Sequence, residues 1–224
     1  MIETGRAYPE VRATIERYGP RERINHGLLA LAFILAALSG LALFHPALFG
    51  LTGLFGGGPW TRILHPFLGL LMLVLLVAFA AGVRSHNRMT PADWAWLRQI
   101  GDVVAGREER LPEVGRYNAG QKLFFHAVLV CLIALFVSGI VIWRAYFSRY
   151  FPIGAIRLGA LLHALFAFLL VAALIVHSYA AIWVRGSIRA MTRGTVTPGW
   201  AFRHHRAWYR EMISHAASSR PRAD

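Results

Sequence analysis

Apolar residues gather into four long runs along the chain, and polar segments rich in arginine separate the runs. A helix needs roughly 20 consecutive apolar residues to cross the hydrocarbon core of a bilayer. Four segments meet this length, at about residues 26–45, 65–83, 123–143 and 158–184. The pattern predicts an all-α membrane protein, a bundle of four transmembrane helices. Because the number of spans is even, both termini are expected on the same side.

The polar segments show helix start signals of their own. Thr90, Pro91 and Asp93 are the cap, first-turn proline and third-position acid of a helix over residues 90–104. Trp94, Leu97, Gly101 and Val104 can share one face of that helix, which either lies on the membrane surface or packs on the ends of the spans. In the tail, Thr197 and Pro198 repeat the start signal. We therefore divide the chain into an N-terminal arm (1–25), a membrane domain (26–184, with a loop at 84–122) and a tail (185–224).

Charge decides the orientation. The chain carries a net charge of +13, yet the charges are segregated from the apolar runs, which indicates contact with membrane lipid and no nucleic-acid partner. The arm, the central loop and the tail hold 20 of the 24 lysines and arginines, Arg6, Arg12, Arg220 and Arg222 among them. The other face holds only Arg62, Arg144, Arg149 and Arg157. The positive-inside rule then places both termini and the central loop in the cytoplasm.

The cysteine content excludes several kinds of redox centre. Cys131 is the only cysteine and lies inside an apolar run, where a small buried hydrophobe is expected. One cysteine excludes an intrachain disulfide, a cluster held by four cysteines of this chain and a CxxCH haem attachment. Seven residues further on, Ser138 and Gly139 allow close approach of a helix or a cofactor, with ordinary helix packing as the simpler interpretation.

Two histidines in the last run carry the candidate chemistry. His163 and His177 are 14 residues apart, which is about 21 Å along a helix and four whole turns of a left-handed bundle. They therefore face one side at two depths, as ligands of two cofactors would. A proton relay in a proton-coupled transporter, which is a different functional class, uses ionisable residues inside the membrane in the same way.

Haem ligation by two histidines requires a partner on another helix at each depth. On one side, His65 opens the second run and is followed one turn deeper by Gly69, whereas His45 precedes Pro46 and is expected in a turn; His65 is favoured. On the other side the candidates are His26, His86 and His126. His86 follows the charged end of its run and is expected in water. Spacing alone leaves His26 and His126 open.

Several short motifs together resemble one family. They are Asn25–His26, LHP at 64–66, YNAGQK at 117–122, His163 with His177, and WAFRHHRAWYRE at 200–211. Over residues 21–211 this set resembles the cytochrome b (gamma) subunit of membrane-bound respiratory formate dehydrogenase. The histidines alone are shared with the cytochrome b subunits of nickel–iron hydrogenases and thiosulfate reductases, which are the alternative. YNAGQK and the histidine pair of the tail are more specific.

The resemblance implies a membrane-anchoring cytochrome with two haem b groups. His65 and His163 would hold the periplasmic haem, and His26 and His177 the cytoplasmic haem. A quinone, menaquinone or ubiquinone, would be reduced beside the second haem at His177, Asn118 and Gly120.

The same resemblance implies the place of the chain in a larger assembly. Its partners would be an iron–sulfur (beta) subunit and, through it, a molybdenum or tungsten formate dehydrogenase catalytic (alpha) subunit. The chain would transfer electrons and reduce quinone in the bacterial inner membrane without oxidising formate itself, and a trimer of heterotrimers is compatible with the family.

Overall fold

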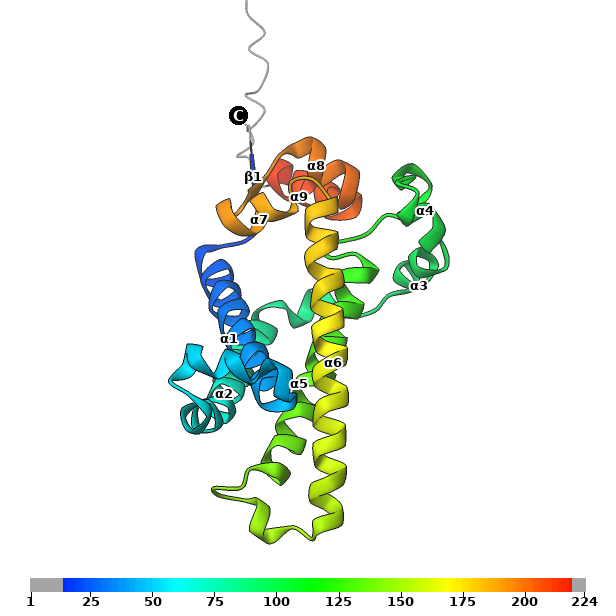
Figure 1. Ribbon diagram of the computed structural model, residues 1–224. Coiled ribbons are helices and arrows are strands. Elements are labelled where there is room, and N and C mark those ends of the chain that lie inside the picture. Colours follow the sequence, from blue (N-terminus) through cyan, green and yellow to red (C-terminus); the bar gives the residue numbers. More distant parts are fainter. Residues whose placement is uncertain (1–13, 219–224) are drawn as a thin grey trace, which may run out of the picture. The chain divides into compact units, whose positions relative to one another are not determined.

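The computed structural model describes residues 14–218, and arginines 6, 12, 220 and 222 of the charge argument lie outside the described residues. Four helices are long and apolar enough to cross a membrane. They are α1 (Pro20–Phe44), α2 (Gly58–Val83), α5 (Ala119–Ile142) and α6 (Ile153–Trp183) (Figure 1). The prediction of four membrane-spanning helices is confirmed.

Each of these helices begins four to seven residues before its predicted start. The apolar run marks only the part of a helix that fits hydrocarbon, whereas a helix continues into polar sequence wherever the backbone permits. The start of α1 contains Arg21, Glu22 and Arg23, and α2 begins with a proline in its first turn, where the missing N–H has no cost.

The described chain divides into two compact units. The membrane unit comprises residues 20–88 and 120–184, and the loop-and-tail unit comprises residues 14–19, 89–119 and 185–218. The arm, the central loop and the tail, which the sequence presents as separate segments, thus belong to one unit.

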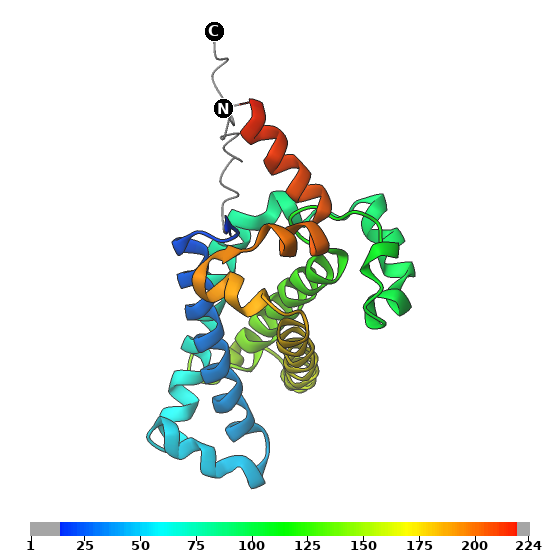
Figure 2. The ribbon, with the colours of Figure 1, turned by 90° about the horizontal axis from the view of Figure 1, so that it is seen from above.

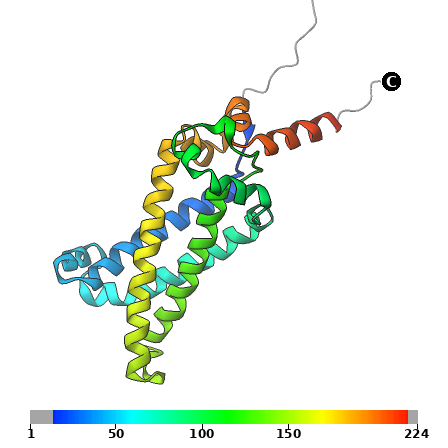
Figure 3. The same cartoon turned by 90° about the vertical axis from the view of Figure 1, so that its right-hand side faces the viewer.

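In the membrane unit the chain forms two hairpins. The 3-10 helix η1 (Pro46–Phe55) connects α1 to α2, and a loop with η4 (Ser148–Tyr150) connects α5 to α6. Figures 2 and 3 show that the α1–α2 hairpin crosses α5 and α6 at a steep angle. At the centre of the unit, Met72, Leu76, Leu132 and Leu170 form a buried cluster with Cys131. Cys131 is a small buried hydrophobe, as its sequence position predicted.

Polar side chains join the helices of this unit at a few positions. Asn25 Nδ2 donates a hydrogen bond of 3.0 Å to the carbonyl of Leu75, which ties α1 to α2 one residue before His26. Lys122 is 6% exposed and donates to the carbonyl of Arg88 at 3.0 Å. Each bond pairs a polar group that would otherwise be unpaired in an apolar environment, where an unpaired polar group is costly.

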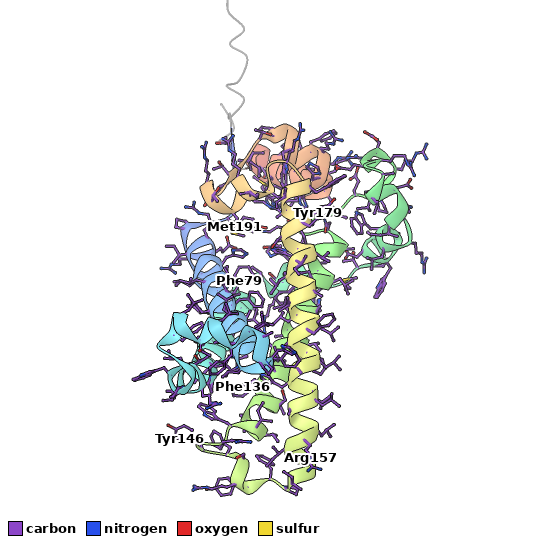
Figure 4. All side chains as sticks on the ribbon, viewed as in Figure 1. Phe79, Phe136, Tyr146, Arg157, Tyr179 and Met191 are labelled. Carbon is purple, nitrogen blue, oxygen red and sulfur yellow. The ribbon has the colours of Figure 1, made fainter. Side chains whose placement is uncertain are left out.

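Aromatic residues gather near both ends of the membrane unit. The ring of Trp143 lies 5.4 Å from Phe67 and 5.2 Å from Tyr146, and the rings of Tyr179 and Trp183 are 5.8 Å apart. Figure 4 shows Tyr146 near one end of α6 and Tyr179 near the other. Such belts are typical of membrane interfaces, where a ring has one apolar side and one wet side.

The loop-and-tail unit departs from an all-α fold at one point. Strands β1 (Ile15–Glu16) and β2 (Thr195–Val196) pair antiparallel with Ile15 opposite Val196. The N–H and C=O groups of Ile15 and Glu16 lie outside any helix, and the strand pairing gives them hydrogen-bond partners in the tail.

The predicted helix over residues 90–104 is present but interrupted. Its capping box is confirmed, because Thr90 accepts from the backbone of Asp93 and Asp93 from the backbone of Thr90. Gln99 divides the segment into α3 (Pro91–Arg98) and α4 (Ile100–Val104). Of the residues predicted to share a face, Trp94 is 56% and Val104 73% exposed, whereas Trp96 packs with Val114 and Ala119.

The tail folds into three short helices. They are α7 (Ser187–Arg193), α8 (Pro198–His204) and α9 (Arg206–Ser218), and the remaining 3-10 turns of the chain are η2 (Arg84–Asn87) and η3 (Glu108–Arg110). The side chain of Thr197 caps α8 by accepting from the backbone of Trp200, as the sequence predicted. Ala190, Val196, Ala201 and Trp208 form the buried core of this part.

Candidate functional site

Two histidines of the membrane unit face each other between α2 and α6. The ring centroids of His65 and His163 are 6.1 Å apart, and their planes are inclined by 74°. A serine from the other helix of each hairpin contacts each ring: Ser39 Oγ lies 2.9 Å from His65 Nδ1, and Ser138 Oγ lies 3.1 Å from His163 Nδ1. Both serines are buried.

The glycine after each serine lies against the same ring. A Cβ atom at Gly40 would stand 3.1 Å from His65 Cε1, and one at Gly139 would stand 3.5 Å from His163 Cε1. The sequence suggested Gly69 as the source of room beside His65. A Cβ atom at Gly69 would meet open space, with no atom within 4 Å. The close approach therefore comes from α1, across the hairpin.

A second pair of histidines lies between α1 and α6. The centroids of His26 and His177 are 6.4 Å apart, with an angle of 48° between the planes. Phenylalanines flank this pair: Phe124 stacks on His177 at 4.2 Å and 7°, and Phe79 lies 6.2 Å from His26. The surroundings of this pair are thus aromatic, whereas those of the first pair carry hydroxyl groups.

Helix α6 contributes one histidine to each pair. It is continuous from Ile153 to Trp183, so His163 and His177 are separated by about 21 Å along its axis. The two pairs therefore lie at two levels of one helix, as the spacing predicted.

The separation within each pair suits one metal ion between two imidazoles. A metal–imidazole bond is about 2 Å long and the ring centre lies on the order of 1 Å behind the bonded nitrogen, so two imidazoles on opposite sides of one metal have centroids about 6 Å apart. Both observed separations match this value. Among the described residues no group of three or more histidine, cysteine, aspartate or glutamate side chains gathers to bind a metal. Two protein ligands for each metal fit a haem, whose porphyrin supplies the other four.

The three other candidate ligands of the sequence analysis, His45, His86 and His126, lie outside the two pairs and are exposed. His45 caps η1, where its Nδ1 accepts from the backbone of Ala47. His86 lies 3.1 Å from the hydroxyl of Ser85. The Nδ1 atom of His126 is 2.8 Å from the carbonyl of Lys122 one turn earlier on its own helix. The four histidines of the two pairs, in contrast, are all partly buried.

Two of the predicted quinone-site residues lie in helices, and the third lies at a helix start. Asn118 immediately precedes α5, Gly120 is the second residue of that helix, and His177 lies on α6. The NxG motif therefore marks a helix start.

The loop-and-tail unit holds a polar cluster that the sequence did not reveal. Arg17 is 2% exposed, and its guanidinium donates to the carbonyl of Arg116, while Arg116 Nη2 donates to the carbonyl of Arg17 at 2.8 Å. His205, 1% exposed, lies 3.3 Å from Arg17 Nη2 and 2.9 Å from the carbonyl of Gly115. The guanidinium can only donate and the carbonyl can only accept, so His205 is neutral with its proton on Nδ1.

Burial and the charge of Arg17 together hold the pKa of His205 well below its usual value. The guanidinium of Arg17 also lies 4.5 Å from the ring centre of Trp208 and within 6 Å of those of Tyr18, Tyr117 and Trp200. No local sequence signal could have found this cluster, because its members come from the arm, the loop and the tail.

Four membrane-length helices with facing histidine pairs at two levels define an integral-membrane cytochrome of the b type. Comparison with known proteins leads to the same class. Residues 17–194 match the family described as prokaryotic cytochrome b561, and the chain belongs to that family.

Individual relatives cover most of the chain. It is 41% identical over 191 residues to the nitrate-inducible formate dehydrogenase cytochrome b556(Fdn) subunit of Escherichia coli (strain K12), covering 85% of this chain and 88% of that one. It is 43% identical over 201 residues to the formate dehydrogenase cytochrome b556(fdo) subunit of the same organism, covering 90% and 94%. With the formate dehydrogenase cytochrome b556 subunit of Haemophilus influenzae the identity is 38% over 199 residues, covering 89% and 84%. The resemblance drawn from the motifs is thus confirmed.

Proposed function

We propose that this chain is the membrane-anchoring cytochrome b subunit of a formate dehydrogenase, with His65 and His163 as the axial ligands of one haem b and His26 and His177 as those of a second. The observation that carries the proposal is the pair of facing imidazoles at each of two levels of α6, with separations suited to one metal. The printed names of the relatives supply the formate dehydrogenase part.

The residues present suit electron transfer. A histidine on each face fills both axial positions of a haem iron and leaves no coordination site for dioxygen. Bound haems would supply one-electron transfer across the membrane, between a periplasmic iron–sulfur (beta) subunit, with its molybdenum or tungsten catalytic subunit, and quinone at the cytoplasmic side. The protein fixes the four imidazoles on helices, which hold ligands more rigidly than loops do.

The orientation rests on charge. The arm, loop and tail hold 20 of the 24 basic residues, which places their side in the cytoplasm of a bacterial cell with the chain in the inner membrane. An electron moved toward the negative side then costs about 2.3 kcal/mol for each 100 mV of membrane potential. Free energy from formate oxidation is conserved in this way as membrane potential.

Quinone reduction is assigned to the level of His26 and His177. His177, Asn118 and Gly120 are the residues proposed to contact the quinone, menaquinone or ubiquinone. An asparagine amide can both donate to and accept from a ring oxygen, and glycine lets the backbone approach a flat ring closely.

The first test counts the haems. A reduced-minus-oxidised spectrum of the purified complex, with haem extracted and quantified, is expected to show two non-covalent b haems for each copy of this chain. A preparation that is folded, made with adequate haem supply and yet free of haem would reject the cytochrome and favour the proton-relay transporter. One haem would mean that one histidine pair is assigned wrongly.

A glycine comparison tests the His65–His163 site specifically. Gly40→Ala places a methyl group 3.1 Å from His65 Cε1, closer than carbon atoms normally approach, so the imidazole must move. We expect haem retention at this site to fall on the order of 10-fold, the scale found when groups that orient a metal ligand are lost.

Gly139→Ala is the matched control, because its methyl group would meet His163 at an ordinary contact distance of 3.5 Å. It should keep both haems in the spectrum. Equal haem loss in the two variants would show that the glycines serve general helix packing.

A further inference from the structure

The two histidine pairs differ in the hydrogen-bond partners of their imidazole rings. In the His65–His163 pair each Nδ1 atom lies within 3.1 Å of a serine hydroxyl. In the described part of the chain neither His26 nor His177 has a hydrogen-bond partner, and phenylalanine rings occupy their surroundings. The same imidazole chemistry is therefore set in two different environments.

Each serine hydroxyl has a carbonyl acceptor within its own helix and is therefore placed to accept from its histidine. Ser39 Oγ donates to the carbonyl of Ala36 at 3.0 Å, and Ser138 Oγ donates to the carbonyl of Ala134 at 2.6 Å, each within its own helix. When the hydroxyl proton goes to that carbonyl, the oxygen accepts a proton from Nδ1, and this is the tautomer that leaves Nε2 free to bind a metal.

The hydroxyl of Ser138 has a second carbonyl acceptor, that of Leu135 at 3.2 Å, which favours the same assignment of protons. With this assignment both imidazoles of the pair are the Nδ1–H tautomer, and their Nε2 atoms keep the lone pair that binds a metal.

The same arrangement occurs once in each hairpin. Ser39 and Gly40 on α1 contact His65 on α2, and Ser138 and Gly139 on α5 contact His163 on α6. Serine orients the ring through its nitrogen, and glycine leaves room for the ring edge. Two independent occurrences around one pair argue against accidental packing.

We propose that Ser39 and Ser138 are positioning residues that lower the reduction potential of the haem held by His65 and His163 relative to that held by His26 and His177. The proposal rests on the haem assignment given above. An N–H donated to an acceptor makes an imidazole a more basic ligand, and a more basic ligand stabilises the oxidised iron. The unbonded imidazoles of the other pair lack this effect.

The inequality has a direction that suits the proposed path. Electrons entering at the lower-potential haem and leaving at the higher-potential haem lose free energy between the two. That loss offsets the cost of moving the electron toward the negative side of the membrane. A difference of about 59 mV between the haems would offset the cost of about 59 mV of membrane potential for each electron.

Redox titration of the purified complex tests the proposal. His177→Ala leaves the His65–His163 haem alone in the α-band, and in that background we expect Ser39→Ala with Ser138→Ala to raise its midpoint potential. At fixed ambient potential the ratio of reduced to oxidised haem should rise on the order of tenfold, which is about 59 mV for a one-electron couple. In a His65→Ala background, which leaves the other haem, the serine substitutions should change nothing.

Two controls make the result specific. Thr61→Ala removes another fully buried hydroxyl, which donates to the carbonyl of Gly57 at 2.8 Å and makes no hydrogen bond to a histidine of the described chain, so it should not shift either potential. Ser138→Thr keeps the hydroxyl and should keep the wild-type potential. If the double variant loses haem, the two single substitutions give the measurement.

The failures are distinguishable. A complex without b haem rejects the proposed function. Two haems whose potentials are unmoved by the serine substitutions, or a shift of the same size with Thr61→Ala, overturn the role of the serines and leave the cytochrome assignment intact.

Discussion

Replacing His177 by alanine is expected to remove one haem and all quinone reduction together. His177 is the only contribution of α6 to the pair with His26 and is also a proposed quinone contact. Loss of an axial ligand should exceed the 10- to 100-fold effects seen for groups that merely orient a ligand, so we expect formate-dependent quinol formation to fall by more than about 100-fold. The haem content should fall from two to one for each chain, with the remaining absorption belonging to the His65–His163 site.

His126→Ala is the matched control. His126 lies at the same end of the membrane unit, but its ring is exposed and its Nδ1 atom lies 2.8 Å from the carbonyl of Lys122. This variant should retain both haems and most of the quinone reduction. His26→Ala should reproduce the His177→Ala result, because both imidazoles are needed for one haem. Quinone reduction at the wild-type rate in His177→Ala would contradict the proposed electron path.

Replacing Arg17 by alanine is expected to open the loop-and-tail unit. The Arg17 side chain is 2% exposed, donates to the carbonyl of Arg116 and has the rings of four aromatic residues within 6 Å of its guanidinium carbon. Alanine removes these cation–π contacts and leaves a cavity, and the two effects together cost about 3 kcal/mol. The strand pair β1–β2 should then separate, because Arg17 directly follows β1.

Limited proteolysis of the intact complex measures this opening. Cleavage follows the population of the open form when closing is fast, so a loss of about 3 kcal/mol raises the cleavage rate within residues 185–218 by about 100-fold. Arg17→Met keeps most of the buried volume and removes a buried charge. It should be cleaved much more slowly than Arg17→Ala. Cleavage of Arg17→Ala at the wild-type rate would show that the arm does not hold the tail.

Local features of this protein were predictable because their causes are local. Hydropathy identifies the four spans, since a helix in hydrocarbon must be apolar wherever it is in contact with lipid. The cap signals at Thr90 and Thr197 marked the starts of α3 and α8, because a cap bonds to the backbone three residues away. The two levels on α6 follow from helix rise alone. The interruption of this helix at Gln99, in contrast, was not predicted.

The spacing of residues along the sequence does not show which side chains from different helices meet. Spacing favoured His26 over His126 only slightly. The packing of α1 beside α6 brings His26, with its neighbour Asn25 bonded to Leu75, to His177. Gly69 is the glycine that the sequence places one turn from His65, yet the close glycine is Gly40 from another helix. The serine–glycine dipeptides are visible in the printed sequence, but their meaning depends on the ring each one meets.

The sequence by itself determined the membrane-spanning helices, the concentration of basic residues in the arm, the central loop and the tail, and the spacing of His163 and His177, because each depends on composition or on neighbours within a few turns. The tertiary structure decided which histidines face each other, which of them are hydrogen-bonded by serine, and that the arm, the central loop and the tail form one unit around Arg17. These contacts join residues 25 to 188 positions apart. Such contacts form only where the helices pack, and no periodicity along a single segment records them.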